Sequence, residues 1–495
     1  MHPVVDNIPA VSILLMMLTG IISTVPHNRK VSYWMNVVAL SVITAANLCL
    51  LIALKDGRYF TYSMGQWGAP WGNELRAGPL EALMGTLLPF VMLLSVLGGR
   101  KDTEHDVLPQ KQGSYYIILD LLMASLLALI YTNDIFTGYV FIEINTITAC
   151  ALVMAKEEGR TLAATLRYLL MSLVGSSMFL MGVALLYGIT GELLMESIAP
   201  KVAEIAGTGS YLLPLAALIC LMVCGLSIKS ALYPFSIWSP DAYGTATTSS
   251  SAVLSGLVSK GYIILLIKIF VRCFKLEVVN SLGITILLFI LGMAAMIMGS
   301  VDAIKATNIK RMLAYSSIAQ IGYIFMGIGL GTEAGITAAC FQIVAHTCTK
   351  PLLFTCAGRL STITGYSSEL KTLRGTARKL PLAGIGFTVG ALSMIGIPLF
   401  AGFTVKIGLA EASYGITWKM LAVLAVLGIS SVLNAMYYIP ALLCIWSADG
   451  NQATEAPARD TAFAIAAIAL IACIFALGIF FRPVMNTITA GFEML

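Results

Sequence analysis

The chain has 495 residues, of which 58% are hydrophobic and 11% are charged, with a mean hydropathy of +0.88. Soluble globular domains average about 25% charged residues, so these values exclude an ordinary soluble protein. The apolar segments are long and lack the alternating pattern of barrel strands, which predicts helices that span a membrane. The formal charge of +5 indicates no nucleic-acid partner, because basic residues of membrane proteins commonly mark cytoplasmic loops.

Fourteen apolar runs approach the ~20 residues that a helix needs to cross a bilayer. They lie near residues 9–26, 32–54, 79–99, 114–132, 134–155, 162–189, 210–238, 245–270, 279–303, 312–330, 333–360, 381–412, 417–446 and 461–481. We therefore predict an all-α polytopic membrane protein with about fourteen transmembrane helices, and the even number places both termini on one side.

Lysine and arginine are distributed unevenly between the predicted loops. The loops that follow odd-numbered spans carry 17 of them, and the other loops carry 9. Positively charged loops tend to stay in the cytoplasm. The first side is thus predicted to be cytoplasmic, so that both termini face outward from a cell (inner) membrane.

The stretch from Leu221 to Phe270 places two lysines, Lys229 and Lys260, in strongly apolar surroundings. A charge at bilayer depth costs about 2.5–3.5 kcal/mol on insertion scales, so such a residue is a candidate for an ion or proton path. Pro234 predicts a break in the seventh span, because proline removes a backbone donor and crowds the preceding turn. Broken membrane helices occur where they line a cavity or are buried in protein.

Glu143 lies in the phrase GYVFIEINTITACALVM, within the predicted fifth span. A buried carboxylate is either neutral or paired with a cation, and Lys229 and Lys260 are the candidate partners. Such a pair can take up and release a proton when one partner moves, and this needs no cofactor. The alternative is a packing residue held by local hydrogen bonds.

The eleventh span, FQIVAHTCTKPLLFTCAG, holds His346 and Lys350, which are four residues apart and therefore share one helix face. Histidine titrates near neutral pH and is suited to relaying protons. Two alternatives stay open: His346 as a packed, hydrogen-bonded residue, and Lys350 extending toward the cytoplasm. Pro351 is expected to loosen the helix locally.

The twelfth span, GALSMIGIPLFAGFTVKIGLAEAS, contains Pro398 near its middle and Lys406 shortly after it. This repeats the combination of a break and a lysine seen at Lys229 and Pro234. If two groups of five helices are copies, they cross the membrane in opposite directions, which is the inverted repeat of many transporters.

The predicted organisation has four parts. Helices 1–3 occupy residues 1–113, the first repeat (helices 4–8) occupies 114–270, the second repeat (helices 9–13) occupies 279–446, and 447–495 holds helix 14.

Five phrases of the sequence resemble a known family in their order along the chain. They are FIEINTITACALV, KSALYPFSIWSPDAY with the later SKGYIIL, NIKRMLAYSSIAQIGYIFMGIGLG, AHTCTKPLLFTCAG and SMIGIPLFAGFTVK. The family is that of the antiporter-like membrane subunits shared by respiratory complex I, Mrp-type Na⁺/H⁺ antiporters and membrane-bound hydrogenases. The resemblance covers roughly residues 60–450, and the phrase MGQWGAPWGNELRAGPLEALM is most similar to the D-type subunit of Mrp antiporters.

The resemblance implies fourteen helices with an inverted repeat and two broken helices. It also implies that Glu143 is the acid of the fifth helix and that Lys229 is its partner on the broken seventh. Lys260 matches the central lysine of the eighth helix, His346 the channel histidine of the eleventh, and Lys406 the outer residue of the broken twelfth. Protons are expected to move along this axis.

The chain departs from the family pattern at three places. Gln342 stands where many members have histidine, the phrase TATTSSSA replaces a loop that is often proline-rich, and Pro351 stands where alanine is common. These departures concern the details of the proton path and leave the resemblance intact.

The predicted function is a proton-translocating membrane subunit of a multisubunit complex, with H⁺/Na⁺ antiport as one form of it. Its expected partners are other membrane subunits, lipid, H⁺ and Na⁺. The alternatives are a stand-alone secondary transporter of a small solute and an antiporter-like subunit of an NADH:quinone oxidoreductase. A structural scaffold would not retain four lysines within spans.

We expect no cofactor and no metal in this chain. It has four His, no CxxC motif and no phosphate-binding glycine loop. The chain itself thus shows no redox or hydrolytic site, although it could serve an ion-translocating oxidoreductase or hydrogenase as a subunit.

Overall fold

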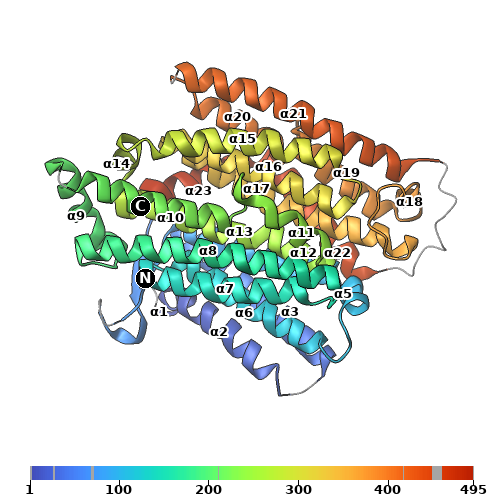
Figure 1. Ribbon diagram of the computed structural model, residues 1–495. Helices are drawn as coiled ribbons and strands as arrows, with labels where there is room; N and C mark the ends of the chain where they lie inside the picture. The colour runs from blue at the N-terminus through green and yellow to red at the C-terminus, as the bar shows by residue number, and fades with distance from the viewer. Residues whose placement is uncertain are drawn as a thin grey trace.

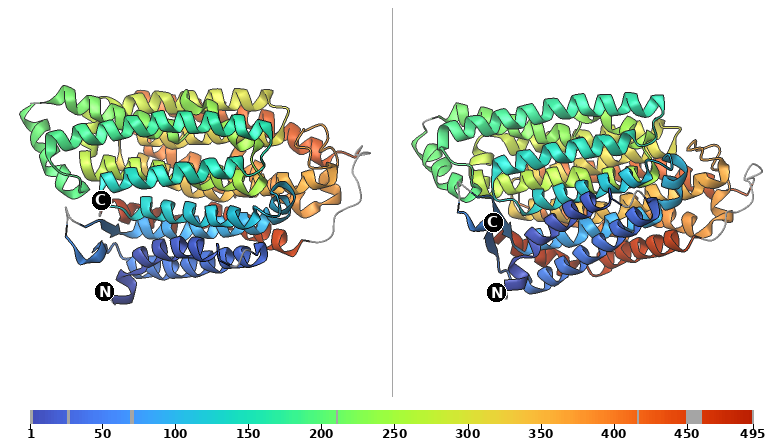
Figure 2. Two further views of the ribbon diagram at one scale, coloured as in Figure 1. Left: turned by 60° about the horizontal axis from the view of Figure 1, so that its bottom comes forward. Right: turned by 90° about the horizontal axis from the view of Figure 1, so that it is seen from below.

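A computed structural model describes residues 3–25, 28–68, 72–209, 211–415, 417–448 and 460–493. The long helices run side by side in one bundle (Figure 1). Both chain ends lie at one end of the bundle, whereas the short helices α5 and α18 lie at the other (Figures 1 and 2).

The helices fall into three groups along the chain. The first group is α1 (Pro3–Asp6), α2 (Ile8–Ile22), α3 (Arg29–Leu54), α4 (Pro79–Gly98), α5 (Arg100–Asp106), α6 (Gln112–Tyr131), α7 (Ile135–Met154), α8 (Gly159–Thr190) and α9 (Met195–Thr208). The second is α10 (Leu212–Lys229), η2 (Phe235–Trp238), α11 (Ser239–Thr245), α12 (Thr248–Val253), η3 (Leu254–Val258), α13 (Ser259–Lys268), η4 (Ile269–Phe274), α14 (Leu276–Ser281), α15 (Ile284–Lys305) and α16 (Ile309–Gly329). The third is α17 (Glu333–Ser361), η5 (Thr362–Thr364), α18 (Thr376–Lys379), α19 (Pro381–Ile395), α20 (Ala401–Ala412), α21 (Thr417–Trp446), α22 (Thr461–Ile479) and α23 (Phe481–Glu493).

Each of the fourteen predicted spans corresponds to a helical segment in the described part of the chain. Eleven segments are long and apolar enough to cross a membrane, and the other three predicted spans match α2, α17 and the pair α19–α20. The prediction of an all-α polytopic membrane protein is confirmed. α17 falls outside the eleven because it is the more polar helix at the centre of the bundle, where protein and not lipid surrounds it.

The centre of the bundle consists of α16, α17 and the continuous segment 248–274. Every residue of α17 from Gly335 to Ser361 is buried, as is the whole apolar window of the segment 248–274. The outer helices α3, α8, α21 and α22 instead expose many large apolar side chains. Polar side chains at the centre can therefore find protein partners, which lipid would not supply.

Two helices are broken, as predicted. α10 ends at Lys229, and the chain passes Pro234 before η2 and α11 resume the course. α19 ends at Ile395, and Pro398 lies in the short connection to α20. Both breaks lie next to lysines that belong to the candidate site.

Glycines bring the helix of the first break close to its neighbour α8. A Cβ atom at Gly175 would lie 2.9 Å from the carbonyl oxygen of Gly225, and one at Gly182 would lie 3.0 Å from that of Leu218. Small residues permit this close approach, which is a common way to pack membrane helices. The contact fixes α10, and with it Lys229, against α8.

Two features were not predicted from the sequence. A small antiparallel hairpin, β1 (Phe60–Ser63) and β2 (Glu74–Ala77), follows α3, with Phe60 opposite Ala77. The predicted eighth span contains two π-helical turns, η3 and η4. The predicted loosening at Pro351 does not break the helix, because α17 runs through this residue without interruption.

Candidate functional site

Lys229 is the last residue of α10 and is almost completely buried. Its ammonium group donates a hydrogen bond of 2.7 Å to the hydroxyl of Thr146 and lies 4.0 Å from Oε1 of Glu143. Glu143 and Thr146 are three residues apart on α7, so they face Lys229 from the same side. This charge pair thus connects α7, the predicted fifth span, with α10, the first half of the predicted seventh span.

Glu143 lies at the edge of the bundle. Its side chain is 26% exposed, while its Oε1 atom is buried and has no hydrogen-bond partner among the described residues. One face of the carboxyl group therefore senses Lys229 and the other faces the outside of the chain. Lys260, which the sequence suggested as a second partner of Glu143, forms its hydrogen bonds elsewhere.

Lys260 is fully buried at the start of α13. Its ammonium group folds back to donate to the carbonyl oxygen of Ser255 in η3 and to the hydroxyl of Ser259, at 3.1 Å. A π-helical turn widens the helix, and such turns are frequent at functional sites. The hydroxyl of Ser255 continues the polar contact to Ser317 on α16, at 2.7 Å.

His346 lies on α17 and is fully buried. No described residue forms a hydrogen bond to either of its ring nitrogens. Lys260 and Lys350 both act electrostatically on the ring, and the neighbouring Thr347 binds the carbonyl oxygen of Gly256 at 3.1 Å. The described residues therefore do not hold the ring as a hydrogen-bonded packing histidine would be held.

Lys350 is completely buried and does not extend to the cytoplasmic surface. Its ammonium group donates to the carbonyl oxygen of Leu313 at 2.9 Å and to the hydroxyl of Tyr438 at 3.4 Å. From the sequence, Lys350 could have extended to the surface or stayed inside the bundle. Its burial shows that it stays inside the bundle.

A polar stripe on α21 continues from Lys350. The hydroxyls of Tyr438 and Tyr437 each lie 2.9 Å from that of Ser316, and Tyr437 also donates to Asn434 at 2.7 Å. The amide of Asn434 donates in turn to the carbonyl oxygen of Met394 near the end of α19, at 3.2 Å. These contacts connect Lys350 to the break in the twelfth helix.

Lys406 is half-buried at that break. Its ammonium group donates to the carbonyl oxygen of Ile395 and to the hydroxyl of Ser431, the latter at 2.6 Å, and lies 5.8 Å from the ring centre of Tyr323. The hydroxyl of Tyr323 binds Ser430 at 2.9 Å. Lys406 therefore meets the same stripe of α21 that begins at Lys350.

Each break has a lysine beside it, but one lysine belongs to the first half of its broken helix and the other to the second half. Lys229 is itself the last residue of α10, whereas Lys406 belongs to α20 and reaches back to Ile395, the last residue of α19. The C-terminal end of a helix carries a partial negative charge, which favours a cation there. Lys229 thus ends the first half of one broken helix, and the ammonium group of Lys406 lies at the negative end of the first half of the other.

A row of hydroxyls leads from one end of the bundle to Lys260. Thr248, Ser251, Ser255 and Ser259 are all buried and are spaced three or four residues apart, so they share one face of the eighth helix. At 1.5 Å per residue this face spans roughly 16 Å from Thr248 to Ser259. From the sequence, the phrase TATTSSSA was interpreted only as a departure from the family pattern. The spacing of its hydroxyl residues could also have indicated a polar helix face.

Asp102 on α5 lies at the outer end of this row. It is buried and forms a hydrogen bond to Thr248. Burial raises the pKa of the Asp102 carboxyl, and the nearby charges of Lys310 and Arg359 reduce that shift. This position of Asp102 could not be predicted from the sequence, because the residue lies in a charged loop segment that is typical of a solvated surface.

A second group of buried charges lies nearer the end that holds the termini. Glu81 and Arg272 form an ion pair in which both side chains are 2% exposed. Lys268 donates to the carbonyl oxygens of Ile130 and Thr132 at the end of α6. Lys268 and Arg272 are among the nine basic residues assigned from the sequence to the loops after even-numbered spans, and this assignment is wrong because both are buried in the bundle.

The described residues contain no group of three or more His, Cys, Asp or Glu side chains placed to hold a metal ion. The ten cysteines are free thiols, mostly buried among apolar side chains. The arrangement offers titratable groups and hydroxyls, and its available chemistry is proton transfer between them.

The fold and the buried line of charges define an antiporter-like, multi-pass membrane protein. The family described as NADH:quinone oxidoreductase/Mrp antiporter, TM, matches residues 132–433. The chain is 34% identical over 405 residues to NADH-quinone oxidoreductase subunit N of Desulforudis audaxviator (strain MP104C), covering 81% of this chain and 78% of that protein. The chain belongs to this family of antiporter-like membrane subunits, as the resemblance implied.

Further relatives come from both branches of the family. A Staphylococcus aureus (strain USA300) protein that bears the name antiporter subunit mnhD2 is 28% identical over 439 residues, which are 88% of this chain and 86% of that protein. A chain of the archaeal membrane-bound sulfane sulfur reductase superposes with a TM-score of 0.88 at 26% identity, covering 99% and 97% of the two chains.

Two more solved structures share the fold. A chain of the Mrp complex from Dietzia sp. DQ12-45-1b has a TM-score of 0.86 at 22% identity and covers 99% and 97% of the two chains. A chain of respiratory complex I from Thermus thermophilus has a TM-score of 0.75 at 24% identity and covers 96% and 98%.

Proposed function

We propose that this chain moves protons across the membrane as one subunit of a multisubunit ion-translocating complex. The observation that carries the proposal is the line Lys229, Lys260, His346 and Lys350, which crosses the centre of the bundle with each side chain almost completely buried. Charges at this depth are costly and are typical of ion or proton paths. The solved relatives are chains of multisubunit assemblies, which supports other membrane subunits as partners.

In the proposed path, protons reach Lys260 from Asp102 along the hydroxyl face of the eighth helix. They pass to His346, whose free ring nitrogens can accept and donate. Lys350 and the stripe of α21 then lead to Lys406, where the half-buried ammonium group exchanges with the outside.

Glu143 and Lys229 form the control element of this path. Two unit charges 4 Å apart interact by about 4 kcal/mol at an effective dielectric constant of 20, so the charge of Glu143 strongly affects the proton on Lys229. Glu143 is partly exposed on the outside of the chain. A neighbouring subunit can therefore change the state of the pair by placing a charge beside Glu143.

The two predicted repeats, 114–270 and 279–446, offer a structural basis for movement. Lys260 belongs to the first, and His346 and Ser317 belong to the second, so the path crosses between them. Transport sites of inverted-repeat proteins lie at this interface. We propose that small rotations of one repeat against the other open and close the step from Lys260 to His346.

The end of the bundle that holds α5 and α18 is assigned to the cytoplasm of a cell membrane, with both termini outside. The greater number of basic loop residues supports this orientation. Asp102 would then collect protons from the cytoplasm, and Lys406 would release them outward.

A second candidate is a subunit of an NADH:quinone oxidoreductase, favoured by the 34% identity to a subunit N. The Mrp-type candidate is favoured by the relative of 28% identity that bears the name of an antiporter subunit. Co-purification separates the two candidates. Iron–sulfur or dehydrogenase subunits would identify a redox-driven pump, and small membrane subunits alone would identify an antiporter.

The test of the proposal uses Lys229→Ala and Glu143→Ala in the assembled complex, followed by ion-gradient measurements in proteoliposomes. We expect both variants to lose most proton movement while the complex still assembles. Full activity in both variants would overturn the assignment of the pair.

A further inference from the structure

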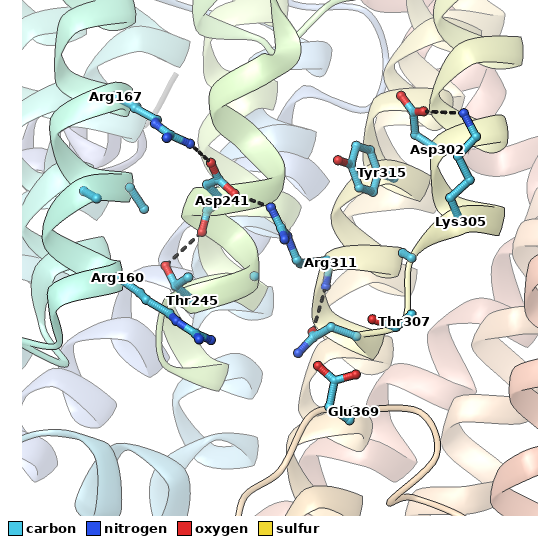
Figure 3. A pocket seen from close by; sticks show the side chains of 15 residues that line it. Arg160, Arg167, Asp241, Thr245, Asp302, Lys305, Thr307, Arg311, Tyr315 and Glu369 are labelled. Carbon is cyan, nitrogen blue, oxygen red and sulfur yellow. Dashed lines mark hydrogen bonds and ion pairs between the residues drawn. The ribbon is translucent and has the colours of Figure 1, made fainter.

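A polar cavity of about 640 Å³ opens at the end of the bundle that we assign to the cytoplasm. Figure 3 shows it between α8, which supplies Arg160 and Arg167, and the helices α11, α15 and α16, which supply Asp241, Lys305 and Arg311. None of these residues belongs to the proposed proton path, so the cavity calls for an explanation of its own.

The cations of the cavity outnumber its acids. Asp241 is held between Arg167 and Arg311, and Lys305 lies 3.7 Å from Asp302. Arg160 forms no ion pair with a described residue. With Glu369 as the third acid, four cations face three carboxylates. Because two arginines share Asp241, the cavity keeps one positive charge in excess, and the guanidinium of Arg160 is not held by a described carboxylate.

The start of α16 adds to this field through its helix dipole alone, because its first backbone N–H groups already donate to Ser368 and to the side chain of Asn308. The helix has 21 residues and begins at Ile309, directly beside Thr307 and Asn308 in the wall of the cavity. The N-terminal end of a helix carries a partial positive charge and favours phosphate groups. Arg311 lies in its first turn, opposite Arg160 across the opening (Figure 3).

Exposed apolar side chains neighbour the lining residues of the cavity in the sequence. On α8, Leu162 is 50% exposed and Leu166 is 57% exposed, and Ile304 on α15 is 37% exposed. These side chains lie on membrane-spanning helices, directly next to the basic residues. A charged opening beside exposed apolar side chains matches the chemistry of a phospholipid.

We propose that the cavity binds the phosphate of an anionic phospholipid between Arg160 and Arg311, with the acyl chains lying along α8 and α15. Basic cavities between membrane helices on the cytoplasmic side are known to take anionic headgroups. The inference does not depend on the proton path. Arg311, one of the two proposed phosphate ligands, also forms an ion pair with Asp241 on α11, the second half of the broken seventh helix.

The first experiment measures lipid binding to the purified complex by native mass spectrometry. Phosphatidylglycerol is titrated into delipidated protein, with phosphatidylcholine and inorganic phosphate as comparison probes. The variants are Arg160→Gln and Arg160→Gln combined with Lys305→Gln. The matched control is Lys371→Gln, an exposed charge in the loop between η5 and α18.

We expect phosphatidylglycerol to bind more tightly than phosphatidylcholine and to weaken roughly fivefold for each charge removed, as for a basic residue at an anionic membrane surface. The Lys371→Gln control should bind as the wild type does. Equal affinity in wild type and variants would overturn the proposal. Binding of inorganic phosphate as tight as that of the lipid would overturn the assignment to a lipid.

The second experiment places a photo-crosslinking amino acid at Ala163, which lines the cavity, in native membranes. A phospholipid adduct that is lost in the Arg160→Gln background supports the proposal. Crosslinks to another protein alone would overturn it and show that a subunit covers this face. This readout remains informative if the double variant fails to fold.

Discussion

At the scale of single residues, the site depends on charges that are buried but not alike. Lys229 has an acidic partner at 4.0 Å, whereas Lys260 and Lys350 bind only carbonyl and hydroxyl oxygens among the described residues. We base on this difference the proposal that Glu143 and Lys229 form a control pair and that Lys260 and Lys350 are carriers.

Sequence reasoning found the charged residues because a lysine in an apolar span is visible by itself. It missed Asn434, Tyr437 and Tyr438, because tyrosine and asparagine are ordinary in membrane helices and their order on α21 depends on the three-dimensional contacts with Ser316.

The link between Lys350 and α21 is tested by Tyr438→Phe. The change removes the hydroxyl that joins Lys350 to Ser316, and we expect proton flux to fall roughly tenfold, as for a hydrogen bond of ~1–1.5 kcal/mol lost from the transfer step. Flux is measured in proteoliposomes with a pH-sensitive dye. Tyr187→Phe, on the exposed face of α8, is the control, and equal flux in both variants would contradict the link.

The glycine at the second break allows a second residue-scale test. Gly396 has φ = +90°, and a Cβ there would lie 2.6 Å from Nζ of Lys406. Gly396→Ala should destabilise the protein by about 1–3 kcal/mol through backbone strain and displace Lys406. Thermal unfolding measures the change.

Gly428→Ala is the matched control for that test, because a Cβ at Gly428 would meet no atom within 4 Å. We expect it to be neutral or stabilising by about 0.5–1 kcal/mol in the helix interior. A loss at Gly428 as large as that at Gly396 would show that the strain argument is wrong.

At the scale of elements, the eighth helix shows where sequence reasoning reaches its limit. Its length and burial were predictable from its apolar residues, but the π-helical turns η3 and η4 were not, because they arise from packing against other helices. A Cβ at Gly256 in η3 would lie 2.6 Å from the ring of Pro351 on α17. This close contact packs η3 against α17, the helix that carries His346, and no local sequence pattern records it.

The short helix α5 carries an element-scale prediction about pH. Burial raises the pKa of Asp102, while Lys310 and Arg359 oppose the shift and Asp106 adds to it. A carboxyl whose pKa is higher in the folded state contributes its stability below the unfolded value of about 4 and loses it as the pH rises through the folded value. The contribution of Asp102 to stability should therefore fall as the pH rises above about 4.

Asp102→Asn tests this prediction, because the amide does not titrate. We expect the unfolding temperature of the wild type, relative to that of the variant, to fall as the pH rises from about 4 toward 7. Thermal unfolding of the two proteins in the same detergent across this range is the measurement. A constant difference would mean that Asp102 has an ordinary pKa.

At the scale of the whole molecule, the positions of all fourteen helical segments could be read from hydropathy, since length and apolar content decide which segments enter lipid. Their arrangement could not be read in this way. Contacts between distant segments place α17 at the centre of the bundle. They also place α5 at the outer end of the hydroxyl face of the eighth helix. The family resemblance supplied the expected order of the charges, and the structure supplied their partners.

Across the whole molecule, buried charges fall into two groups that we assign to different purposes. The line from Lys229 to Lys406 lies at the centre and at the breaks, where charge can change. Glu81, Arg272 and Lys268 instead fix helix ends near the termini through ion pairs and carbonyl contacts. Burial of a charge alone therefore does not identify the path.

The central claim is that buried titratable side chains carry protons through this chain, and Lys260 is its most direct test. Proton movement is measured in proteoliposomes containing the assembled complex with Lys260→Met, Lys260→Arg or the exposed control Lys371→Met. The account predicts that Lys260→Met lowers the flux roughly tenfold or more, that Lys371→Met leaves it unchanged, and that Lys260→Arg, which keeps its proton, is also impaired. Full proton flux in an assembled Lys260→Met complex would contradict the account.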